Sequence, residues 1–273
     1  MVAGTSAVIH AQRLPILAAM TDGPGSPFSR AARKWLTPGA PGHYAAGRWK
    51  NSRALQRDPI LVERILERYS ARPGLKPVLD APCGAGRLRA LFERRGLRYV
   101  GVDGSTAILA EAQQGERVRE AAGSLLAGEV ERLPFRDDSF DVVVCCRLLH
   151  HLHDPDEIRA AISELTRVSH RLVVASFWDS ASLHALRRRV GLRRNEDQGG
   201  RRAVSKRLLR ALFRESGAEV VGFYHSFRFV SQQTFVVAQK RAPAEARLAT
   251  TAHLSRELLD LPLRHAPGSL GGA

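Results

Sequence analysis

The sequence has few cysteines, and their spacing builds neither a disulfide framework nor a zinc site. Its 273 residues include three cysteines, of which Cys145 and Cys146 are adjacent and Cys83 stands apart. No Cys-x-x-Cys pair occurs in the chain, so we predict no metal centre of that type. So little cysteine is typical of a reducing compartment, and we expect a cytoplasmic protein.

Long apolar runs and aromatic residues are also scarce. No uninterrupted apolar stretch approaches the roughly 18 residues that a membrane-spanning helix requires, so no membrane span is predicted. Phe, Trp and Tyr make up 6% of the chain, which leaves little aromatic surface for stacking nucleic-acid bases. Hydrophobic residues at 44% and charged residues at 25% are ordinary for a globular protein, which excludes a chain disordered throughout.

Acidic residues are scarce at both ends of the chain, whose net charge is +15. Residues 1–75 carry 11 basic and 4 acidic side chains, residues 76–175 carry 14 and 15, and residues 176–273 carry 17 and 8. A near-neutral centre between basic flanks indicates a ligand-binding core whose periphery faces anions. A solvated, arginine-rich surface is the alternative interpretation.

Clusters of glycine and proline divide the chain into three parts. Residues 1–56 lack a sustained hydrophobic period, and we expect a flexible N-terminal extension there. Residues 241–273 are rich in Ala, Arg and Gly and indicate a C-terminal tail. Between them, residues 57–240 form the predicted domain, in which Asp58 before Pro59 is expected to cap the first helix.

Helix and strand periods alternate through this domain. The predicted strands cover residues 78–80, 99–103, 124–129, 140–146, 172–177, 219–224 and 229–239, and the predicted helices cover 58–69, 87–95, a segment from 105, 154–168 and 205–216. This alternation predicts an α/β fold with an open, mainly parallel sheet and helices on both faces. The last two strands lie too close in sequence for a helical crossover, so they should pair antiparallel.

Two acidic residues end successive predicted strands beside a glycine-rich turn. Asp80 precedes the turn that contains Gly84 and Gly86, and Asp103 ends the next strand. Ligands of open α/β sheets bind at the carboxyl ends of the strands, where glycine lets the backbone approach closely. A carboxylate at Asp103 suits ribose hydroxyls, whereas an acid at Asp80 suits a cationic ligand better than a pyrophosphate. The third glycine of the dinucleotide pattern is replaced by Arg89, so S-adenosylmethionine is favoured over NAD.

Four motifs resemble those of the class I S-adenosylmethionine-dependent methyltransferases. Residues 78–86, VLDAPCGAG, resemble the first motif, and Val102-Asp103 resembles the second. Residues 128–135, GEVERLPF, resemble the adenine-binding loop of small-molecule and quinone methyltransferases, and residues 140–152 resemble the fourth-strand motif. The resemblance covers about residues 58–240. It implies a Rossmann-like sheet of seven strands with the last antiparallel, helices on both faces, and S-adenosyl-L-methionine as cofactor.

The resemblance also implies which residues hold that cofactor. The positions concerned are Asp80, Cys83, Gly84, Gly86, Asp103, Glu129, Val130 and Cys146. Asp80 would face the methionine ammonium group, directly or through water, although a capping role is its structural alternative. Asp103 would bind the ribose hydroxyls. Glu129 would accept from the adenine amino group, with Glu131 as the alternative, and the backbone amide of Val130 would lie beside it.

The cysteines and a pair of histidines near this site allow both chemical and structural interpretations. The Pro-Cys motif of carbon-5 pyrimidine methylation is missing from the fourth strand, so Cys83, Cys145 and Cys146 are expected to be buried thiols. The resemblance implies that backbone carbonyls near Cys146 and Arg147 receive the methionine ammonium. His150 and His151 are the catalytic candidates, as general bases. Their alternative is a structural role, because an in-line methyl transfer relies largely on positioning.

The methyl acceptor is the least determined feature. Residues 187–214 carry 11 basic and 2 acidic side chains, and we expect residues 180–214 to form a basic lid beside the site. A small-molecule or lipid-like acceptor is favoured, because the fold is minimal and the adenine loop resembles those of small-molecule enzymes. The alternatives are RNA held by the arginine-rich segment through phosphate contacts, and a methyltransferase fold that binds a partner without catalysis.

Overall fold

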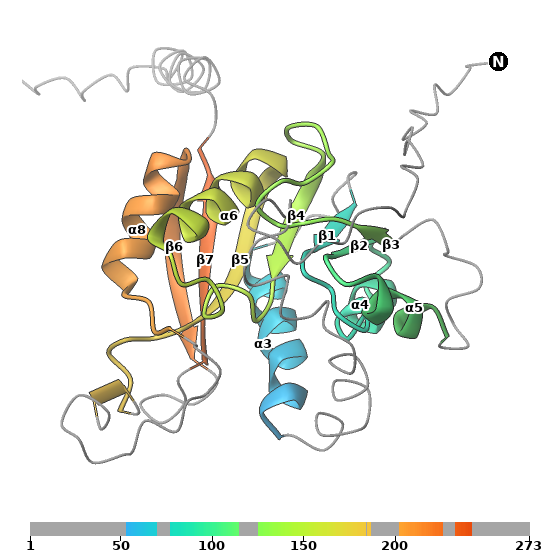
Figure 1. Ribbon diagram of the computed structural model, residues 1–273, viewed down its shortest axis with the longest axis horizontal. Helices are drawn as coiled ribbons and strands as arrows, with labels where there is room; N and C mark the ends of the chain where they lie inside the picture. The colour runs from blue at the N-terminus through green and yellow to red at the C-terminus, as the bar shows by residue number, and fades with distance from the viewer. Residues whose placement is uncertain are drawn as a thin grey trace, which may run out of the picture.

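The computed structural model describes residues 53–69, 77–114, 125–183, 185–186, 202–225 and 233–241. These residues form a seven-stranded sheet with helices packed on its faces (Figure 1). Most of the predicted N-terminal extension, residues 187–201 of the predicted lid and nearly all of the predicted tail lie outside the described residues.

The sheet has the strand order β3-β2-β1-β4-β5-β7-β6. Its strands are β1 (Val78–Asp80), β2 (Tyr99–Asp103), β3 (Leu125–Ala127), β4 (Phe140–Cys145), β5 (Ser169–Trp178), β6 (Ala218–His225) and β7 (Gln233–Lys240). The pairings among β1 to β5 are parallel, whereas β7 runs antiparallel to both β5 and β6. The predicted seven-stranded α/β sheet with an antiparallel last strand is therefore confirmed.

In the described part of the chain, five labelled helices connect or precede these strands. They are α3 (Arg53–Tyr69), α4 (Arg89–Arg94), α5 (Thr106–Gln114), α6 (Pro155–Val168) and α8 (Lys206–Glu215). Three of them, α5, α6 and α8, begin where the sequence indicates. The side chain of Asp154 accepts from the backbone of Asp156 and forms a capping box with Glu157, and Ser205 Oγ accepts from the N–H of Leu208 at 3.1 Å.

The predicted start of the first helix is wrong. Helix α3 begins at Arg53, so Asp58 and Pro59 lie inside it rather than at its first turn. The side chain of Asp58 does not cap the helix, because its carboxylate is bound instead by two arginines from other segments. Tertiary ion pairs therefore bind the Asp58 carboxylate, which the local sequence pattern predicts to be a helix cap.

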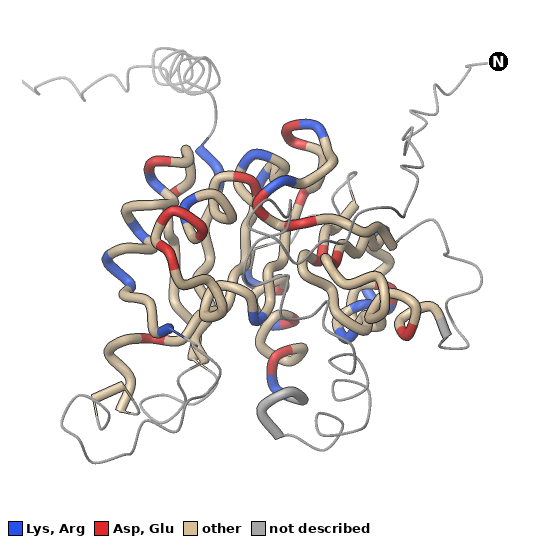
Figure 2. The backbone as a smooth tube through the Cα atoms, in the orientation of Figure 1, with Lys and Arg blue, Asp and Glu red and all other residues tan. Residues whose placement is uncertain are grey.

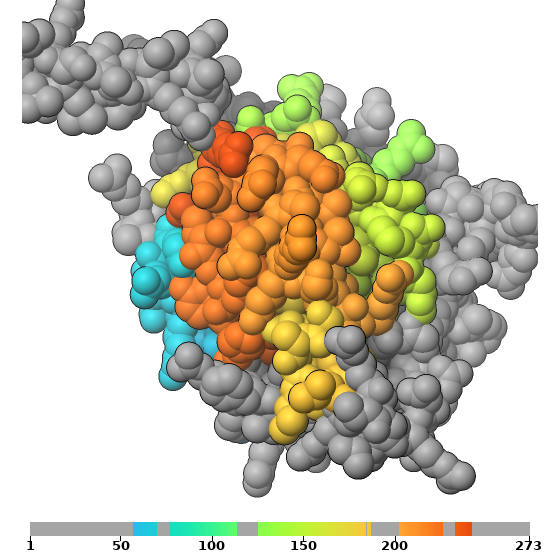
Figure 3. Space-filling view, turned by 90° about the vertical axis from the view of Figure 1, so that its left-hand side faces the viewer, coloured from blue at the N-terminus to red at the C-terminus, as the bar shows by residue number. Residues whose placement is uncertain are grey.

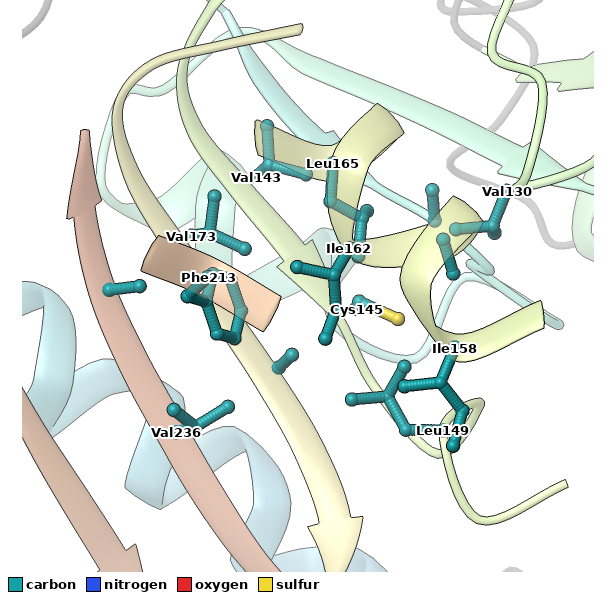
Figure 4. Close-up of a cluster of buried hydrophobic side chains, with 14 of the residues drawn as sticks. Val130, Val143, Cys145, Leu149, Ile158, Ile162, Leu165, Val173, Phe213 and Val236 are labelled. Atoms are coloured by element: carbon teal, nitrogen blue, oxygen red, sulfur yellow. The ribbon is translucent and has the colours of Figure 1, made fainter. Parts of the chain in front are cut away.

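Alternating side chains of the strands build two cores, one on each face of the sheet. On β4, Val143 and Cys145 face helices α6 and α8, whereas Val142 and Val144 face helices α3 and α4. Figure 4 shows the first core, in which Phe213 of α8 packs near the aliphatic residues of α6, β4 and β5. Each such fully buried aliphatic or aromatic side chain stabilises the fold by about 1.5–3 kcal/mol.

The strand order reverses at the centre of the sheet. From β1 the chain passes to β2 and β3 on one side, then crosses to β4 on the other side. The carboxyl ends of β1 and β4 therefore diverge at a topological switch point, which is where open α/β sheets bind their ligands. The predicted site residues follow these strand ends.

Candidate functional site

The turn after β1 is held against β2 by its own backbone. The N–H of Cys83 donates to the carbonyl oxygen of Val102 at 2.8 Å, and the N–H of Gly86 donates to the carbonyl of Cys83 at 3.1 Å. Gly84 and Gly86 have φ values of 55° and 72°, in the left-handed region that side chains other than glycine rarely adopt. Both glycines are therefore required by the backbone path of the turn.

The carboxylate of Asp103, at the end of β2, joins this turn to the next helix. Its Oδ2 accepts from the N–H of Gly84 at 2.8 Å, and its Oδ1 accepts from the N–H of Ser105 at 2.9 Å. Burial raises the pKa of Asp103, while the two backbone donors lower it. Each carboxylate oxygen accepts more than one hydrogen bond, so both retain capacity for ligand hydroxyls.

Asp80, at the end of β1, is a buried carboxyl group with one unsatisfied oxygen. The hydroxyl of Tyr99 donates to its Oδ2 at 3.3 Å, whereas its Oδ1 has no hydrogen-bond partner among the described residues. Burial raises the pKa of Asp80 to about 7, although Arg87 and the Tyr99 hydroxyl lower it. An orphaned buried acceptor at a switch point fits a ligand that supplies a donor, above all a cationic one.

The loop after β3 reaches the same place through its backbone. The N–H of Gly128 donates to the carbonyl of Asp103 at 3.1 Å, which places the following residues beside the end of β2. Glu129 is half-buried, and its carbonyl accepts from the N–H of Arg132 at 3.1 Å. Val130 is buried and joins the core cluster drawn in Figure 4. The structure thus brings Glu129 near Asp103, as the motif spacing indicates.

All three cysteines are buried thiols. Burial raises the pKa of Cys83 and Cys145 far above the ordinary thiol range, and burial together with Asp58 raises that of Cys146 to about 12. A nucleophilic cysteine needs its thiolate form, so none of the three is poised for covalent catalysis. This agrees with the structural interpretation of Cys83 and Cys145.

The histidine pair follows β4 and packs under the end of β5. The ring of His150, which is 2% exposed, stacks on Trp178 with centroids 4.8 Å apart, and its carbonyl accepts from the N–H of Arg202. His151 is half-buried, with its ring centroid 4.4 Å from that of His150. The more accessible His151 is therefore the better placed of the two to meet a ligand.

An ion-pair cluster at the switch point was not anticipated from the motifs. Asp58, whose side chain is 0% exposed, accepts on Oδ2 from Arg147 Nε at 2.7 Å and from Arg87 Nη1 at 3.1 Å. Arg87 belongs to the turn after β1 and also donates to Cys146 Sγ at 3.4 Å. The position of Arg87 directly after the glycine turn was the signal that the sequence offered. No local pattern, however, links Arg87 to Asp58, 29 residues earlier.

Arg147 has a strained backbone as well as this ion pair. Its φ is 67°, a left-handed conformation that costs a non-glycine residue about 1–3 kcal/mol. Its N–H donates to Ser176 Oγ at 2.7 Å. Strain of this kind persists where surrounding contacts fix the residue, and it concentrates at functional sites.

The described residues contain neither a metal-binding cluster nor a membrane-spanning helix. No group of three or more His, Cys, Asp or Glu side chains in this part of the chain is arranged to hold a metal ion. No helix within it is long and apolar enough to cross a bilayer.

Comparisons with known proteins find methyltransferases among the proteins similar to this chain. Residues 79–173 match a family described as "Methyltransferase domain". The malonyl-[acyl-carrier protein] O-methyltransferase of Serratia marcescens is 34% identical over 125 residues, which are 46% of this chain and 45% of that protein. The demethylmenaquinone methyltransferase of Thermobifida fusca is 34% identical over 102 residues, which are 37% of this chain and 43% of that protein. The chain thus spans less than half the length of these two relatives.

The fold also matches solved structures. The magnesium protoporphyrin IX methyltransferase of Synechocystis PCC 6803, solved with bound SAM, aligns with a TM-score of 0.58 at 18% identity, over 79% of this chain and 100% of that one. At this identity the likeness concerns the fold, and the sequence match to residues 79–173 carries the assignment. Over residues 79–173 the chain is therefore similar to methyltransferase domains.

Proposed function

We propose that the protein transfers a methyl group from S-adenosylmethionine to a small-molecule acceptor. The observation that carries this proposal is the orphaned, buried Oδ1 of Asp80 beside the Asp103 carboxylate at the switch point. Such a pair offers an acceptor for an ammonium group and acceptors for ribose hydroxyls, and neither suits a phosphate. The motif match over residues 79–173 supports the same cofactor.

In this proposal the chain's own residues position the reactants. Asp80 would hold the cofactor's ammonium group, Asp103 its ribose and the Glu129 loop its adenine. When bound, the cofactor supplies an electrophilic methyl group on a sulfonium. In-line displacement then depends chiefly on alignment and on the exclusion of water, which together account for a large part of such accelerations. His151 would assist only if the acceptor must lose a proton.

A small-molecule acceptor is favoured over a macromolecular one. Relatives that match this chain are named as demethylmenaquinone and ubiquinone-biosynthesis methyltransferases, and another is named for malonyl-[acyl-carrier protein]. The described residues form one minimal sheet domain, and its adenine loop resembles those of small-molecule enzymes. The cytoplasmic location inferred from the cysteine content stays a prediction.

The test is a labelled methyl transfer into fractionated cell extract. Purified protein and methyl-tritiated S-adenosylmethionine are incubated with extract, which is then separated into RNA, protein, lipid and small metabolites. We expect label in the metabolite or lipid fraction, and less label there with the Asp103→Ala variant at a subsaturating cofactor concentration. Label in an RNA fraction that ribonuclease removes would contradict the small-molecule acceptor, and no transfer into any fraction would favour a silent binding protein.

A further inference from the structure

Arg147 is fixed at its backbone and at Nε, but not at its terminal nitrogens. The backbone N–H is bound by Ser176 Oγ, and Nε is bound by Asp58 Oδ2. Among the described residues, neither Nη nitrogen of Arg147 has a hydrogen-bond partner. The side chain of Arg147 is 21% exposed. Its guanidinium group is held in one orientation through Nε, and its two terminal N–H₂ groups have no hydrogen-bond partner among the described residues.

Asp58 is bound in a way that orients Arg147 without occupying it fully. All its donors among the described residues, Arg147 Nε, Arg87 Nη1 and the Cys146 thiol, meet the single oxygen Oδ2. The other oxygen, Oδ1, is buried without a partner in the described part of the chain. A bidentate pair would have used both carboxylate oxygens and an Nη group. Because Asp58 contacts only Nε, the two Nη groups of Arg147 remain available to a ligand.

The position of Arg147 connects it to the proposed methyl-donor site. It follows Cys146 directly after β4, and β4 pairs with β1 so that Val144 lies opposite Asp80. Arg147 therefore stands at the same switch point as the orphaned oxygen of Asp80. A guanidinium with two free parallel donors matches the geometry of a carboxylate better than that of any neutral group.

We propose that Arg147, oriented by Asp58, forms a carboxylate-binding subsite at the carboxyl end of β4. The inference rests on the proposed function and deepens it. Two sources offer this chemistry, the amino-acid carboxylate of the cofactor and a carboxylate on the methyl acceptor. Asp58 is a positioning residue in this arrangement, because it acts on the ligand only through Arg147.

Binding measurements with the full chain test the subsite. Titration calorimetry compares S-adenosylhomocysteine with its decarboxylated analogue, and NMR follows the binding of benzoate in the absence and presence of saturating S-adenosylhomocysteine. The variants are Arg147→Gln, Arg147→Lys and Asp58→Asn, with Arg171→Gln as the matched control. Arg171 is an exposed arginine near the start of β5, at the opposite end of the strands from Arg147.

Each source of the carboxylate gives its own result. If it is the cofactor's, the wild type binds S-adenosylhomocysteine at least about tenfold more tightly than the decarboxylated analogue, and Arg147→Gln abolishes that difference. If it belongs to the acceptor, S-adenosylhomocysteine affinity stays unchanged in Arg147→Gln, but only the wild-type complex binds benzoate. In either case Asp58→Asn reduces the effect and Arg171→Gln leaves it intact.

Two results would overturn the subsite. In the first, Arg147→Gln keeps the wild-type preference for S-adenosylhomocysteine over the decarboxylated analogue, or keeps the wild-type affinity for benzoate. The other is a wild type that shows neither the preference nor benzoate binding. Should Arg147→Gln not fold, Arg147→Lys keeps the charge but loses the fork, and it must lose most of the effect. A wild type that fails to bind S-adenosylhomocysteine contradicts the proposed function, and benzoate binding then decides the subsite alone.

Discussion

Asp103 ties three segments of the chain together at the candidate site. Its carboxylate accepts from Gly84 and Ser105, and its own carbonyl accepts from the N–H of Gly128. The glycine turn, the start of α5 and the loop after β3 therefore meet at one residue. The order of the motifs along the sequence predicts this meeting, because the carboxyl ends of neighbouring parallel strands lie together.

We predict that Asp103→Ala weakens the binding of S-adenosylhomocysteine at least about tenfold. If Asp103 binds the ribose as proposed, the variant removes the acceptors of two hydrogen bonds, and each bond to a charged group contributes about 1.5–3 kcal/mol. Isothermal titration calorimetry measures the change. Glu219→Ala is the control, because Glu219 is an exposed acid on β6. Unchanged affinity in Asp103→Ala would remove the assignment of the ribose site.

The pKa of Asp80 predicts opposite effects of pH on stability and on cofactor binding. Burial raises this pKa from 3.8 to about 7, so the folded protein retains a proton that the unfolded chain releases. The stabilisation is complete below about pH 4 and is lost as pH rises through 7. Binding of an ammonium group needs the ionised carboxylate, so affinity for S-adenosylhomocysteine should rise up to about tenfold per pH unit below 7 and then level off.

Asp80→Asn provides the matched control for this pH dependence. The amide has nearly the same shape as the carboxyl group but does not titrate. Calorimetry between about pH 5.5 and 8, a range that brackets the pKa of about 7, should therefore show a weak affinity that does not change with pH. The groups that act on Asp80, namely Arg87, Tyr99 and Asp103, remain in this variant. A slope that persists in Asp80→Asn would assign the titration to another group.

For His151 we predict a structural role. Its N–H donates to the carbonyl of Leu148, and its ring packs beside that of His150. His151→Asn should therefore retain methyl transfer within about tenfold, measured as turnover once an acceptor is identified. General-base catalysis typically contributes about 10²–10⁴-fold, so a loss of about a thousandfold with intact cofactor binding would establish His151 as the base.

At the scale of elements, helix starts that depend on local capping were predictable and those that depend on tertiary contacts were not. Asp154 and Ser205 cap α6 and α8 through neighbours two or three residues away. Asp58 has the same local signature, yet Arg147, 89 residues later, binds its carboxylate inside α3. For the same reason the motifs located Asp80 and Asp103 but gave no sign of the Arg87–Asp58–Arg147 cluster.

The cap of α6 carries a prediction of its own. Asp154→Ala removes the acceptor for the N–H of Asp156 and half of the capping box, so it should destabilise the protein by about 1 kcal/mol. For a domain of this size that lowers the melting temperature by about 2–4 °C in scanning calorimetry. Ser163→Ala, at an exposed position within α6, should leave the melting temperature nearly unchanged. Equal melting temperatures for Asp154→Ala and wild type would contradict the cap.

At the scale of the whole molecule, helix α8 presents a row of basic residues. Figure 2 shows Lys and Arg along α8, and Figure 3 shows α8 at the centre of its face with α6 beside it. Arg207, Arg210 and Arg214 are exposed there at helical spacing. The basic residues 187–201 that precede α8 in the sequence lie outside the described residues, so the predicted lid stays a prediction.

This charge distribution predicts only weak, salt-sensitive association with RNA. If the acceptor were RNA, several phosphate contacts would make the affinity fall by about 10³-fold or more between 50 and 200 mM salt. We expect weak binding at 50 mM salt that does not compete with methyl transfer, as measured by fluorescence anisotropy with a non-specific RNA. Tight binding that inhibits transfer to small acceptors would contradict this expectation.

The interior position of β7 has a consequence for the order in which the domain is completed. β7 pairs with β5 from Leu172↔Gln239 to Trp178↔Gln233, and it also pairs with β6 on its other side. On the ribosome, β5 and β6 are synthesised before β7, the strand that pairs with both. Until β7 emerges, each of them lacks its pairing with β7. A nascent chain stopped between β6 and β7 would carry every proposed cofactor residue and yet leave one edge of β5 and both edges of β6 unpaired. Unpaired strand edges are templates for aggregation.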